Sequence, residues 1–390
     1  MEVKPGYKQT DIGALPGDWR VAKIKDVASI TTGKRNTQDR IEDGLYPFFV
    51  RSQTVERINS FSFDGEAVLT AGDGVGTGKV FHYINGKFDF HQRVYKLADF
   101  SADLNGFFFH LYFSTHFYDR IMSMTAKSSV DSVRLETIAG MQIPLPPLPE
   151  QRAIAGALSD VDALLGALDQ LIAKKRDLKQ AAMQRLLTGQ IRLPGFHGEW
   201  AEKCLGDVIE RLIGGGTPSR ANPAFWGNEI PWVTVKDFAT FHPLKTQEAI
   251  TKEGLKQSAS HLIPAGTLIT STRMALGNAV IYAMDVAINQ DLKALYLRPN
   301  ANVRFVYYWF EHHAKMIDEL GSGSTVKGIS IGDLKGIPFR LTSVAEQTAI
   351  AGVLSDMDAE LAALEQRRAK TRALKQGRMQ ELLTGRTRLI

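Results

Sequence analysis

One segment of this sequence occurs twice, and this duplication constrains the fold more than any other feature. Residues 150–189 and 346–385 align without a gap at an offset of 196, and 27 of the 40 aligned positions are identical. Each copy follows a longer and more divergent stretch. The repeat therefore predicts a pseudo-two-fold, circular arrangement of four parts: a first globular domain at 1–149, a long helix at 150–189, a second globular domain at 190–345, and a long helix with a C-terminal tail at 346–390.

Both copies carry apolar residues at alternating steps of four and three, which is the pattern of a coiled-coil seam. The seam residues are Ile154, Leu158, Val161, Leu165 and Leu168 in the first copy, and Ile350, Leu354, Met357, Leu361 and Leu364 in the second. The copies then diverge, with Ile172 in the first and Arg368 in the second. A helix of this length reaches about 60 Å and cannot bury such a stripe alone. We expect the two copies to pair as antiparallel helices; the alternative is that they are ordinary core helices of two tandem domains.

The ends of the two copies share a second apolar cluster. Its members are Leu178, Met183, Leu186 and Leu187 in the first copy, and Leu374, Met379, Leu382 and Leu383 in the second. We interpret these ends as docking surface rather than as further seam. Gly189 and Gly385 follow directly and are predicted to end the helices, since glycine is the residue that favours this position.

Both globular domains combine strand-like and helical patterns. Short runs at 46–50, 66–70, 79–84 and 91–97 alternate with Gly, Asp and Asn turns, as expected for strands. The aromatic segment 105–124 is predicted to be a buried helix. The second domain repeats this order in outline, with an aromatic segment at 306–320. The fold class is therefore mixed α/β, with two α/β domains separated by the two long antiparallel helices.

Composition narrows the class of protein. A single cysteine, Cys204, excludes an internal disulfide framework and fits a reducing compartment. The first residues lack the apolar core of a signal peptide, and no apolar run approaches the roughly 20 residues that span a bilayer. We therefore expect a cytoplasmic protein without membrane contact. The net charge of +5 hints at nucleic acid, although no segment is strongly cationic, so DNA binding would use local patches or the charge of a partner.

Several repeated motifs resemble those of a known family. They are GDW and GEW near the domain starts, GGGTPSR at 214–220, the prolines before EQ, EQxAIAGxLSDxD, and LKQ…MQxLLTG in both copies. With these motifs the whole chain resembles the DNA-specificity subunit of type I restriction–modification systems. The resemblance implies two target recognition domains that each read half of a split double-stranded DNA site. It also implies that the helices set the spacer and dock two modification (methyltransferase) subunits, with restriction (motor–nuclease) subunits as further partners.

No Ser–His–Asp spacing, acidic nuclease cluster or metal-ligand spacing stands out in the sequence, so we expect no catalytic and no metal site. The resemblance implies that this chain binds no cofactor of its own and that S-adenosylmethionine, ATP and magnesium belong to the partner subunits. DNA contacts would come from polar loops, because Arg and Lys suit guanine and phosphate and Asn and Gln suit adenine. The candidates in the first domain are Lys34, Arg35, Asn36, Gln38, Arg51, Gln53, His91, Gln92, Arg93, Lys127 and Ser128. Those in the second are Thr217, Ser219, Arg220, Ser271, Thr272, Arg273, Asn289, Gln290, Ser324, Thr325 and Lys327.

Two rival functions remain open from the residues. The first is a DNA adenine or cytosine methyltransferase with its own recognition domain, suggested by the glycine-rich segment 70–79 and by NPAF at 222–225. These segments lie far apart in the sequence, and we interpret them as a hairpin turn and as a helix entry or turn. The second is a non-catalytic two-headed coiled-coil adaptor. The adjacent His312 and His313 point in different directions on a helix and make a poor metal pair.

Overall fold

The computed structural model describes residues 4–124, 132–323 and 327–389. The chain divides into two compact units. Unit 1 consists of Met1–Asp169 and Arg367–Ile390, and unit 2 of Gln170–Gln366. Among the residues described, no helix is long and apolar enough to cross a membrane.

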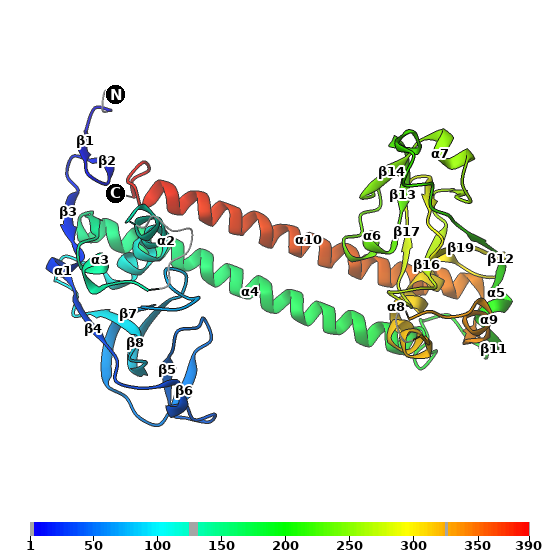
Figure 1. Ribbon diagram of the computed structural model, residues 1–390. Helices are drawn as coiled ribbons and strands as arrows, with labels where there is room; N and C mark the ends of the chain where they lie inside the picture. The colour runs from blue at the N-terminus through cyan, green and yellow to red at the C-terminus, as the bar shows by residue number, and fades with distance from the viewer. Residues whose placement is uncertain (1–3, 125–131, 324–326, 390) are drawn as a thin grey trace. The chain divides into compact units, whose positions relative to one another are not determined.

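Unit 1 contains the first globular domain, which is built around one curved sheet covered by an aromatic helix (Figure 1). Its strands are β1 (Tyr7–Thr10), β2 (Gly13–Pro16), β3 (Arg20–Lys23), β4 (Ser29–Thr32), β5 (Tyr46–Phe49), β6 (Glu56–Ile58), β7 (Phe63–Ala71), β8 (Phe81–Phe90), β9 (Val94–Ala98) and β10 (Gln142–Leu145). Its helices are α1 (Ile24–Val27), the 3-10 turn η1 (Thr37–Asp39), α2 (Gly106–Met124) and α3 (Leu135–Ala139). Six strands form a sheet in the order β4-β9-β7-β8-β5-β6. All neighbours are antiparallel except β5 and β8, which are parallel.

The aromatic helix α2 packs on this sheet, as its composition predicts. Phe108, Phe109, Phe113 and Phe117 are fully buried. They share a core with Val68 of β7 and Leu97 of β9. The four strand predictions for this domain are confirmed by β5, β7, β8 and β9, and the predicted buried helix by α2.

Unit 2 contains the second globular domain, which repeats this plan with an interrupted sheet. Its strands are β11 (Ala201–Cys204), β12 (Ile209–Gly214), β13 (Trp226–Val233), β14 (Glu248–Ile250), β15 (Leu262–Ile263), β16 (Leu268–Ser271), β17 (Ala279–Ile281), β18 (Val286–Ile288), β19 (Leu292–Leu297) and β20 (Pro338–Leu341). Its helices are α5 (Leu205–Val208), η2 (Pro223–Phe225), α6 (Val235–Ala239), α7 (Lys252–Lys256), α8 (Val303–Leu320) and α9 (Ile331–Gly336). The strands form two sheets, ordered β12-β19-β16-β17 and β14-β13-β18-β15. The short strands β17 and β18 stand where the first domain has the single long strand β8.

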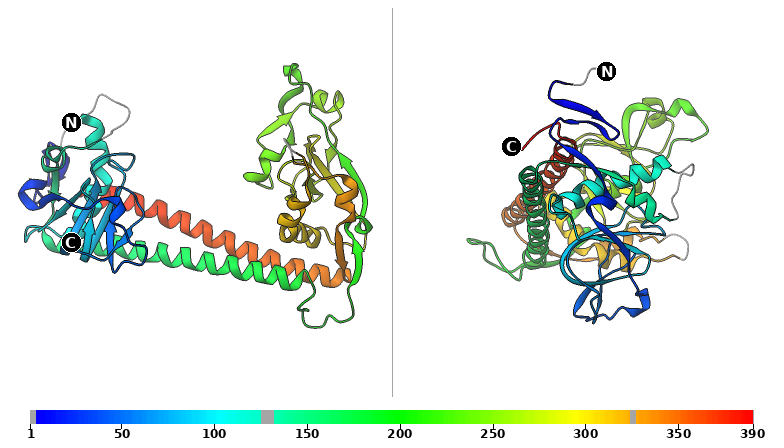
Figure 2. Two further views of the ribbon diagram at one scale, coloured as in Figure 1. Left: turned by 60° about the horizontal axis from the view of Figure 1, so that its bottom comes forward. Right: turned by 90° about the vertical axis from the view of Figure 1, so that its left-hand side faces the viewer.

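The long helices are α4 (Leu148–Leu186) and α10 (Val344–Leu382), and both contribute to both units. Within each unit they run antiparallel. In unit 1, Lys375 Nζ lies 2.6 Å from Asp162 Oδ1, and Arg368 Nη1 lies 2.8 Å from Asp169 Oδ1. In unit 2, Lys175 Nζ lies 2.7 Å from Glu360 Oε1. The residue numbers rise on one helix as they fall on the other, which confirms the predicted antiparallel pair (Figure 2).

Burial along the predicted seam differs between the copies. On α4, Ile154, Leu158, Leu165 and Leu168 are buried and Val161 is half-buried. On α10, Ile350 and Leu354 are buried, whereas Met357, Leu361 and Leu364 are half-buried. At the point of divergence, Ile172 is buried, while Arg368 forms the ion pair with Asp169. The seam residues of α4 other than Val161 therefore stay buried as far as Ile172, whereas those of α10 are fully buried only at Ile350 and Leu354, which also belong to the core of unit 2.

The structure corrects the interpretation of the helix ends as docking surface. Met183, Leu186 and Leu187 lie in the core of unit 2, and Leu382 and Leu383 lie in the core of unit 1, with Met379 half-buried against it. Only Leu178 and Leu374 of the shared cluster are exposed. The ends are apolar because each one packs into a globular domain. The last turn of α4 packs into the second domain, and that of α10 into the first.

Glycine caps end both helices as predicted. Gly189 has φ +72° and Gly385 has φ +68°, in the left-handed region that other residues rarely adopt. A Cβ atom at Gly385 would lie 2.5 Å from Pro16 Cδ, and one at Gly189 would lie 3.3 Å from Trp200. Each cap thus places a tryptophan-bearing segment against the end of its helix.

An arginine clamp joins each globular domain to the long helices. In unit 1, Arg388 donates to Glu150 Oε1 at 2.6 Å and to Asp18 Oδ2 at 2.8 Å, and Trp19 Nε1 donates to Glu150 Oε2 at 3.0 Å. Hydrogen bonding to Arg388 lowers the pKa of Asp18. The buried Glu150 is the first residue of the EQ motif, so the motif fixes the start of α4.

Unit 2 repeats the clamp with residues displaced by 196 positions. Arg192 donates to Glu346 Oε1 at 2.5 Å and Oε2 at 2.7 Å, with its guanidinium 5.8 Å from the ring of Trp200. Burial alone would raise the pKa of Glu346, but hydrogen bonds from Arg192 and Thr342 outweigh it and lower the pKa. The two units are thus assembled from equivalent parts of the sequence.

Candidate nucleic-acid interface

The candidate residues of the first domain gather where β4, β5, β7 and β8 end. The Arg35 carbonyl accepts from the Gln92 amide at 2.9 Å, and Gln92 Nε2 donates to Asn36 Oδ1 at 2.6 Å. Asn36 also caps η1. The loop after β4 and the turn between β8 and β9 therefore form one polar surface, with Lys34 and Gln38 exposed on it.

The Arg35 side chain is held by a buried carboxylate. Its Nε donates to Asp89 Oδ2 at 3.1 Å, and its Nη2 donates to Ser60 Oγ at 2.9 Å. Burial would raise the pKa of Asp89, but bonds from Ser62, Ser60 and Arg35 outweigh it and lower the pKa. Asp89 remains ionised and positions Arg35 at the edge of the surface.

A second carboxylate in this domain organises two arginines. Arg51 Nη1 lies 2.9 Å from Asp73 Oδ1, and Arg93 Nε lies 3.6 Å from Asp73 Oδ2. The neighbouring His91 is buried, and its Nδ1 accepts from the Arg93 amide at 2.9 Å. Burial, and then the positive charge of Arg51, lower the pKa of His91, so the imidazole is neutral at physiological pH. His91 shapes the turn, and the two guanidinium groups face outward.

The remaining candidates of the first domain divide in two groups. Gln53 is exposed on the loop after β5. Lys127 and Ser128 lie outside the described residues.

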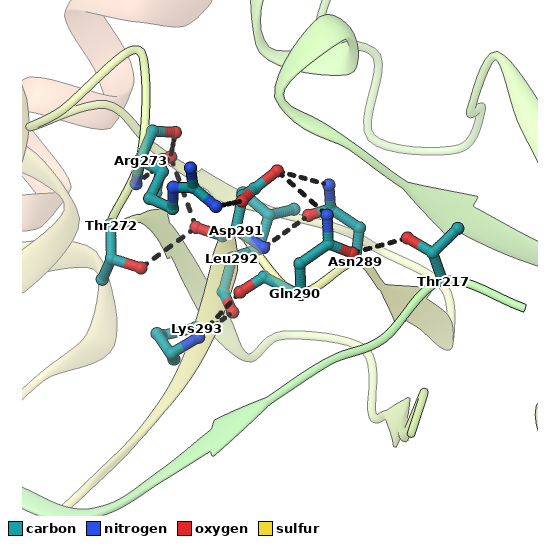
Figure 3. A network of polar contacts seen from close by, with 9 residues as sticks. Thr217, Thr272, Arg273, Asn289, Gln290, Asp291, Leu292 and Lys293 are labelled. Atoms are coloured by element: carbon teal, nitrogen blue, oxygen red, sulfur yellow. Dashed lines mark hydrogen bonds and ion pairs between the residues drawn. The ribbon is translucent and has the colours of Figure 1, made fainter. Parts of the chain in front are cut away.

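In the second domain, the corresponding surface is centred on the turn between β18 and β19 (Figure 3). Thr217 Oγ1 donates to Gln290 Oε1 at 2.5 Å. Asn289 is buried, and its Nδ2 donates to Asp291 Oδ2 at 3.1 Å. Gln290 is exposed beside them, and its Nε2 donates to Asp291 Oδ2 at 3.4 Å.

The Ser-Thr-Arg segment after β16 is only partly available. Ser271 and Thr272 are buried; the Ser271 hydroxyl donates to the Arg273 carbonyl at 2.6 Å, and the Thr272 hydroxyl to the Asp291 carbonyl at 3.2 Å. These two buried hydroxyls are bonded within the chain and hold the loop, and their contact with DNA stays a prediction. The Arg273 side chain is exposed, with Nη1 3.5 Å from Asp291 Oδ1.

Arg220 has a mainly internal role. Its two terminal nitrogens donate to Glu248 at 2.5 and 2.9 Å, and its guanidinium stacks 3.6 Å from the ring centre of Trp226. The bonds to Glu248 raise the pKa of Arg220. The exposed Ser219 accepts a bond from Trp226 Nε1 through its carbonyl. Arg220 thus fastens the GGGTPSR loop to β14 and the tryptophan.

The last candidates of the second domain lie at its 322–328 loop. Lys327 Nζ lies 2.7 Å from Asp318 Oδ2 at the end of α8. Ser324 and Thr325 lie outside the described residues.

Sequence reasoning missed the acidic residues that organise these surfaces, namely Asp73, Asp89, Glu248 and Asp291. Asp291 directly follows the candidates Asn289 and Gln290 in the sequence, so the signal was present. In the structure these carboxylates orient the basic and amide groups beside them.

The segments that suggested a methyltransferase have structural roles. Residues 72–80 connect the antiparallel strands β7 and β8, and NPAF forms the 3-10 turn η2 capped by Asn222. They belong to different units. His313 Nδ1 bonds to the Trp309 carbonyl, and Cys204 is an exposed free cysteine. Within the described ranges, no three His, Cys, Asp or Glu side chains are grouped as metal ligands.

Comparison with known proteins identifies the class. The sequence model of the type I restriction modification DNA specificity domain matches residues 16–174 and again 197–372. A putative type I restriction enzyme specificity subunit, MjaX of Methanocaldococcus jannaschii, is 25% identical over 98% of this chain and 97% of its own length. The EcoR124I/EcoR124II specificity subunit of Escherichia coli is 29% identical over 41% of each chain.

Solved structures agree on the fold. The S subunit of a type I restriction–modification system from M. genitalium superposes with a TM-score of 0.65 at 16% identity, covering 98% of both chains. A chain from a study of complex assembly and conformational transition of the type I R-M system has a TM-score of 0.56 at 18% identity, covering 95% of this chain and 99% of its own.

Fold and polar loops together define a DNA-recognition protein with two recognition domains. The two family matches cover most of the sequence, so the chain belongs to the type I restriction modification DNA specificity family. The prediction of a non-catalytic specificity subunit is confirmed by this membership.

Proposed function

We propose that the chain reads a split DNA target, with each globular domain contacting one half-site through its own polar loops. The observation that carries this proposal is a common loop scaffold with unlike side chains. The turn after β8 presents Gln92 bonded to Asn36, and the turn after β18 presents Gln290 bonded to Thr217. The two glutamines are equivalent, but the next residue of the turn is Arg93 in the first domain and Asp291 in the second, and such different donors and acceptors suit two different half-sites.

The charges of the first surface suit DNA. Lys34, Arg35, Arg51 and Arg93 gather at one end of the sheet, where guanidinium groups can bond phosphate oxygens or the O6 and N7 atoms of guanine. The amides of Gln92 and Gln290 are exposed and suit adenine, and each would exchange a bond within the loops for one to the base. Phosphate contacts would position the domain, and contacts to base edges would specify the sequence.

The proposal extends to the partners. Two modification (methyltransferase) subunits would carry S-adenosylmethionine, and restriction (motor–nuclease) subunits would carry ATP and magnesium. Family membership supports this assignment. The exposed Leu178 and Leu374, at equivalent positions of α4 and α10, offer each modification subunit an apolar contact of the same kind.

Methylome sequencing tests this function directly. The chain is co-expressed with a type I modification subunit from the same source in a host without other DNA methylation, and methylated positions are mapped. We expect one asymmetric, bipartite motif that requires both proteins. Methylation by the chain alone would favour the methyltransferase alternative, and a complex without sequence preference would favour the adaptor.

A further inference from the structure

The two domains carry the same charged contact with opposite polarity. In the first domain the carboxylate, Asp73, stands on the loop between β7 and β8, and its partner Arg93 stands on the turn before β9. In the second domain the loop carries the guanidinium, Arg273, and the turn carries the carboxylate, Asp291. The charged atoms are separated by 3.6 Å in one domain and 3.5 Å in the other.

Main-chain hydrogen bonds show that these positions are equivalent. The Gly72 amide donates to the Arg93 carbonyl at 2.8 Å, and the Thr272 amide donates to the Asp291 carbonyl at 2.9 Å. In each case the next loop residue bridges to a segment that follows the aromatic helix, Asp73 to Ser132 and Arg273 to Gly328. The backbone is therefore conserved between the domains while the charges have changed places.

Loop conformation strengthens this equivalence. Gly74 follows Asp73 with φ +78°, and Met274 follows Arg273 with φ +57°, in the region that side chains rarely adopt. Ala275 is also left-handed, with φ +41°. Backbone strain of this kind is concentrated at functional sites. The second domain thus keeps the path of the loop at an energetic cost.

The first domain adds a second guanidinium to this contact. Each oxygen of Asp73 faces one arginine, Arg51 or Arg93, and each arginine keeps further N–H donors free. About half of the Arg51 side chain and two thirds of the Arg93 side chain are exposed, against a quarter of Asp73. One carboxylate thus holds two outward-facing cations from different strand ends. The second domain has one arginine here, and Asp291 is also bonded by Asn289.

We propose that this loop–turn contact determines the specificity of each half-site. In the first domain, Asp73 is a positioning residue that aims Arg51 and Arg93 at a guanine-containing base step in the major groove. In the second domain, the reversed pair moves the guanidinium from the turn to the loop and leaves Gln290 as the neighbouring amide. The inference rests on the proposed function, since it assigns the readers within the same recognition surfaces.

Exchange of the charges tests the proposal. The double variant Asp73→Arg with Arg93→Asp places the arginine on the loop and the aspartate on the turn of the first domain. The second domain already has this arrangement on an equivalent backbone. Methylome mapping of the full complex should show the first half-site altered and the second unchanged. The matched variant, Arg273→Asp with Asp291→Arg, should alter only the second half-site.

Two single variants test whether DNA recognition depends on the placement of the guanidinium groups or only on the number of positive charges. They also test the proposal if the exchange variant does not fold. Arg51→Lys and Asp73→Asn should each lower the preference for the cognate first half-site over a guanine-substituted one by about 10- to 100-fold. With Arg51→Lys, the salt dependence of binding should stay the same, because the number of cations is unchanged. Melting temperature and circular dichroism report whether the variants are folded.

The outcomes are distinct. If the wild-type complex methylates no bipartite motif, the proposed function fails. If the wild-type motif is bipartite but the folded exchange variant keeps its first half-site, or if both single variants keep their base preference, the inference about this contact fails and the function stands.

Discussion

Each recognition domain has one end that contacts the long helices and an opposite end that carries the polar loops. The helix ends of the two domains share the same side-chain contacts, whereas the loop ends differ. At the end that meets the long helices, both domains are held by the same arginine–glutamate pair, Arg388 with Glu150 in unit 1 and Arg192 with Glu346 in unit 2. The buried Gln151 and Gln347 repeat this equivalence, since each accepts the amide of an asparagine before its aromatic helix at 2.8 Å. At this end of the domain, each of these side chains bonds to residues on several helices, strands or loops, so it cannot change alone.

At the loop end, side chains mainly satisfy one another. Asn36 bonds to Gln92 where Thr217 bonds to Gln290, and the charges of Asp73 and Arg93 are reversed in the second domain. A residue whose partner lies in the same loop cluster can change together with that partner without disturbing the core. The molecule therefore separates a constant scaffold from exchangeable reading groups.

The largest effect is expected from shortening both helices together. Deletion of seven residues from the middle of α4 and seven from the equivalent part of α10 preserves the heptad pattern. At 1.5 Å per residue this removes about 10 Å, or about 3 base pairs of spacer. Methylome mapping should show both half-sites retained with a shorter spacer and the original target unmodified. An unchanged spacer would show that the length of the helices does not set the distance between the two half-sites.

Core truncation at the helix ends comes next. Leu383→Ala and Leu187→Ala should each destabilise the chain by about 2–5 kcal/mol, because both side chains are buried in a domain core. Leu374→Ala is the control, since Leu374 is exposed and its loss should cost under about 0.5 kcal/mol. Urea unfolding measures both. Equal costs for Leu383 and Leu374 would restore the view of the helix ends as pure docking surface.

The clamps should be unequal. Arg388 bonds to two carboxylates and Arg192 to one, so Arg388→Gln should destabilise the protein by about 1–2 kcal/mol and more than Arg192→Gln does. The depressed pKa of Asp18 adds stability above its ordinary value of about 4, and that stability is lost as the pH falls.

Arg388→Gln removes the pH-dependent stability that the lowered pKa of Asp18 supplies. The difference in free energy of unfolding between wild type and Arg388→Gln should therefore shrink between about pH 5 and pH 3. Urea midpoints at both pH values check this expectation. A deficit that grows on acidification would contradict the assigned pairing.

The smallest expected effect is the difference in stability cost between replacing Lys179 and replacing Lys375, which occupy equivalent positions on the two long helices. Lys179 bonds to both Glu311 and Asp358 and is 12% exposed, whereas Lys375 bonds to Asp162 alone and is 21% exposed. Burial lowers the pKa of Lys179, but the bonds to Asp358 and Glu311 outweigh it and raise the pKa. Lys179→Met should cost about 1–2 kcal/mol and Lys375→Met under about 1 kcal/mol by thermal unfolding. The reverse order would show that Glu311 adds nothing.

Repetition made the architecture predictable from the sequence. The offset of 196 between the copies located both long helices, and the steps of four and three located Ile154, Leu158, Ile350 and Leu354, which are all buried. The aromatic density of residues 105–124 predicted the covering helix α2. These signals are local or periodic, so they can be read without knowing which segments meet.

The site was less predictable because it depends on contacts between distant residues. Arg220 and Arg93 look alike in the sequence, yet Arg220 bonds to Glu248 through both terminal nitrogens and stacks on Trp226, while Arg93 makes one 3.6 Å contact with Asp73. The helix-end leucines likewise show an apolar pattern that does not reveal whether a globular domain or a partner covers it. Loop composition could identify the surface but not the roles of its members.

The shared cores have a consequence for synthesis on the ribosome. Unit 2 is continuous in sequence, whereas unit 1 joins residues up to Asp169 with residues from Arg367 onward. Leu382, Leu383 and Arg388 therefore reach the first recognition domain only after the whole second unit has been translated. Until then Leu382 and Leu383 do not cover the core around Trp19 and Ile154, and exposed apolar surface of this kind favours aggregation. Although its recognition domain is translated first, unit 1 is the last to be completed.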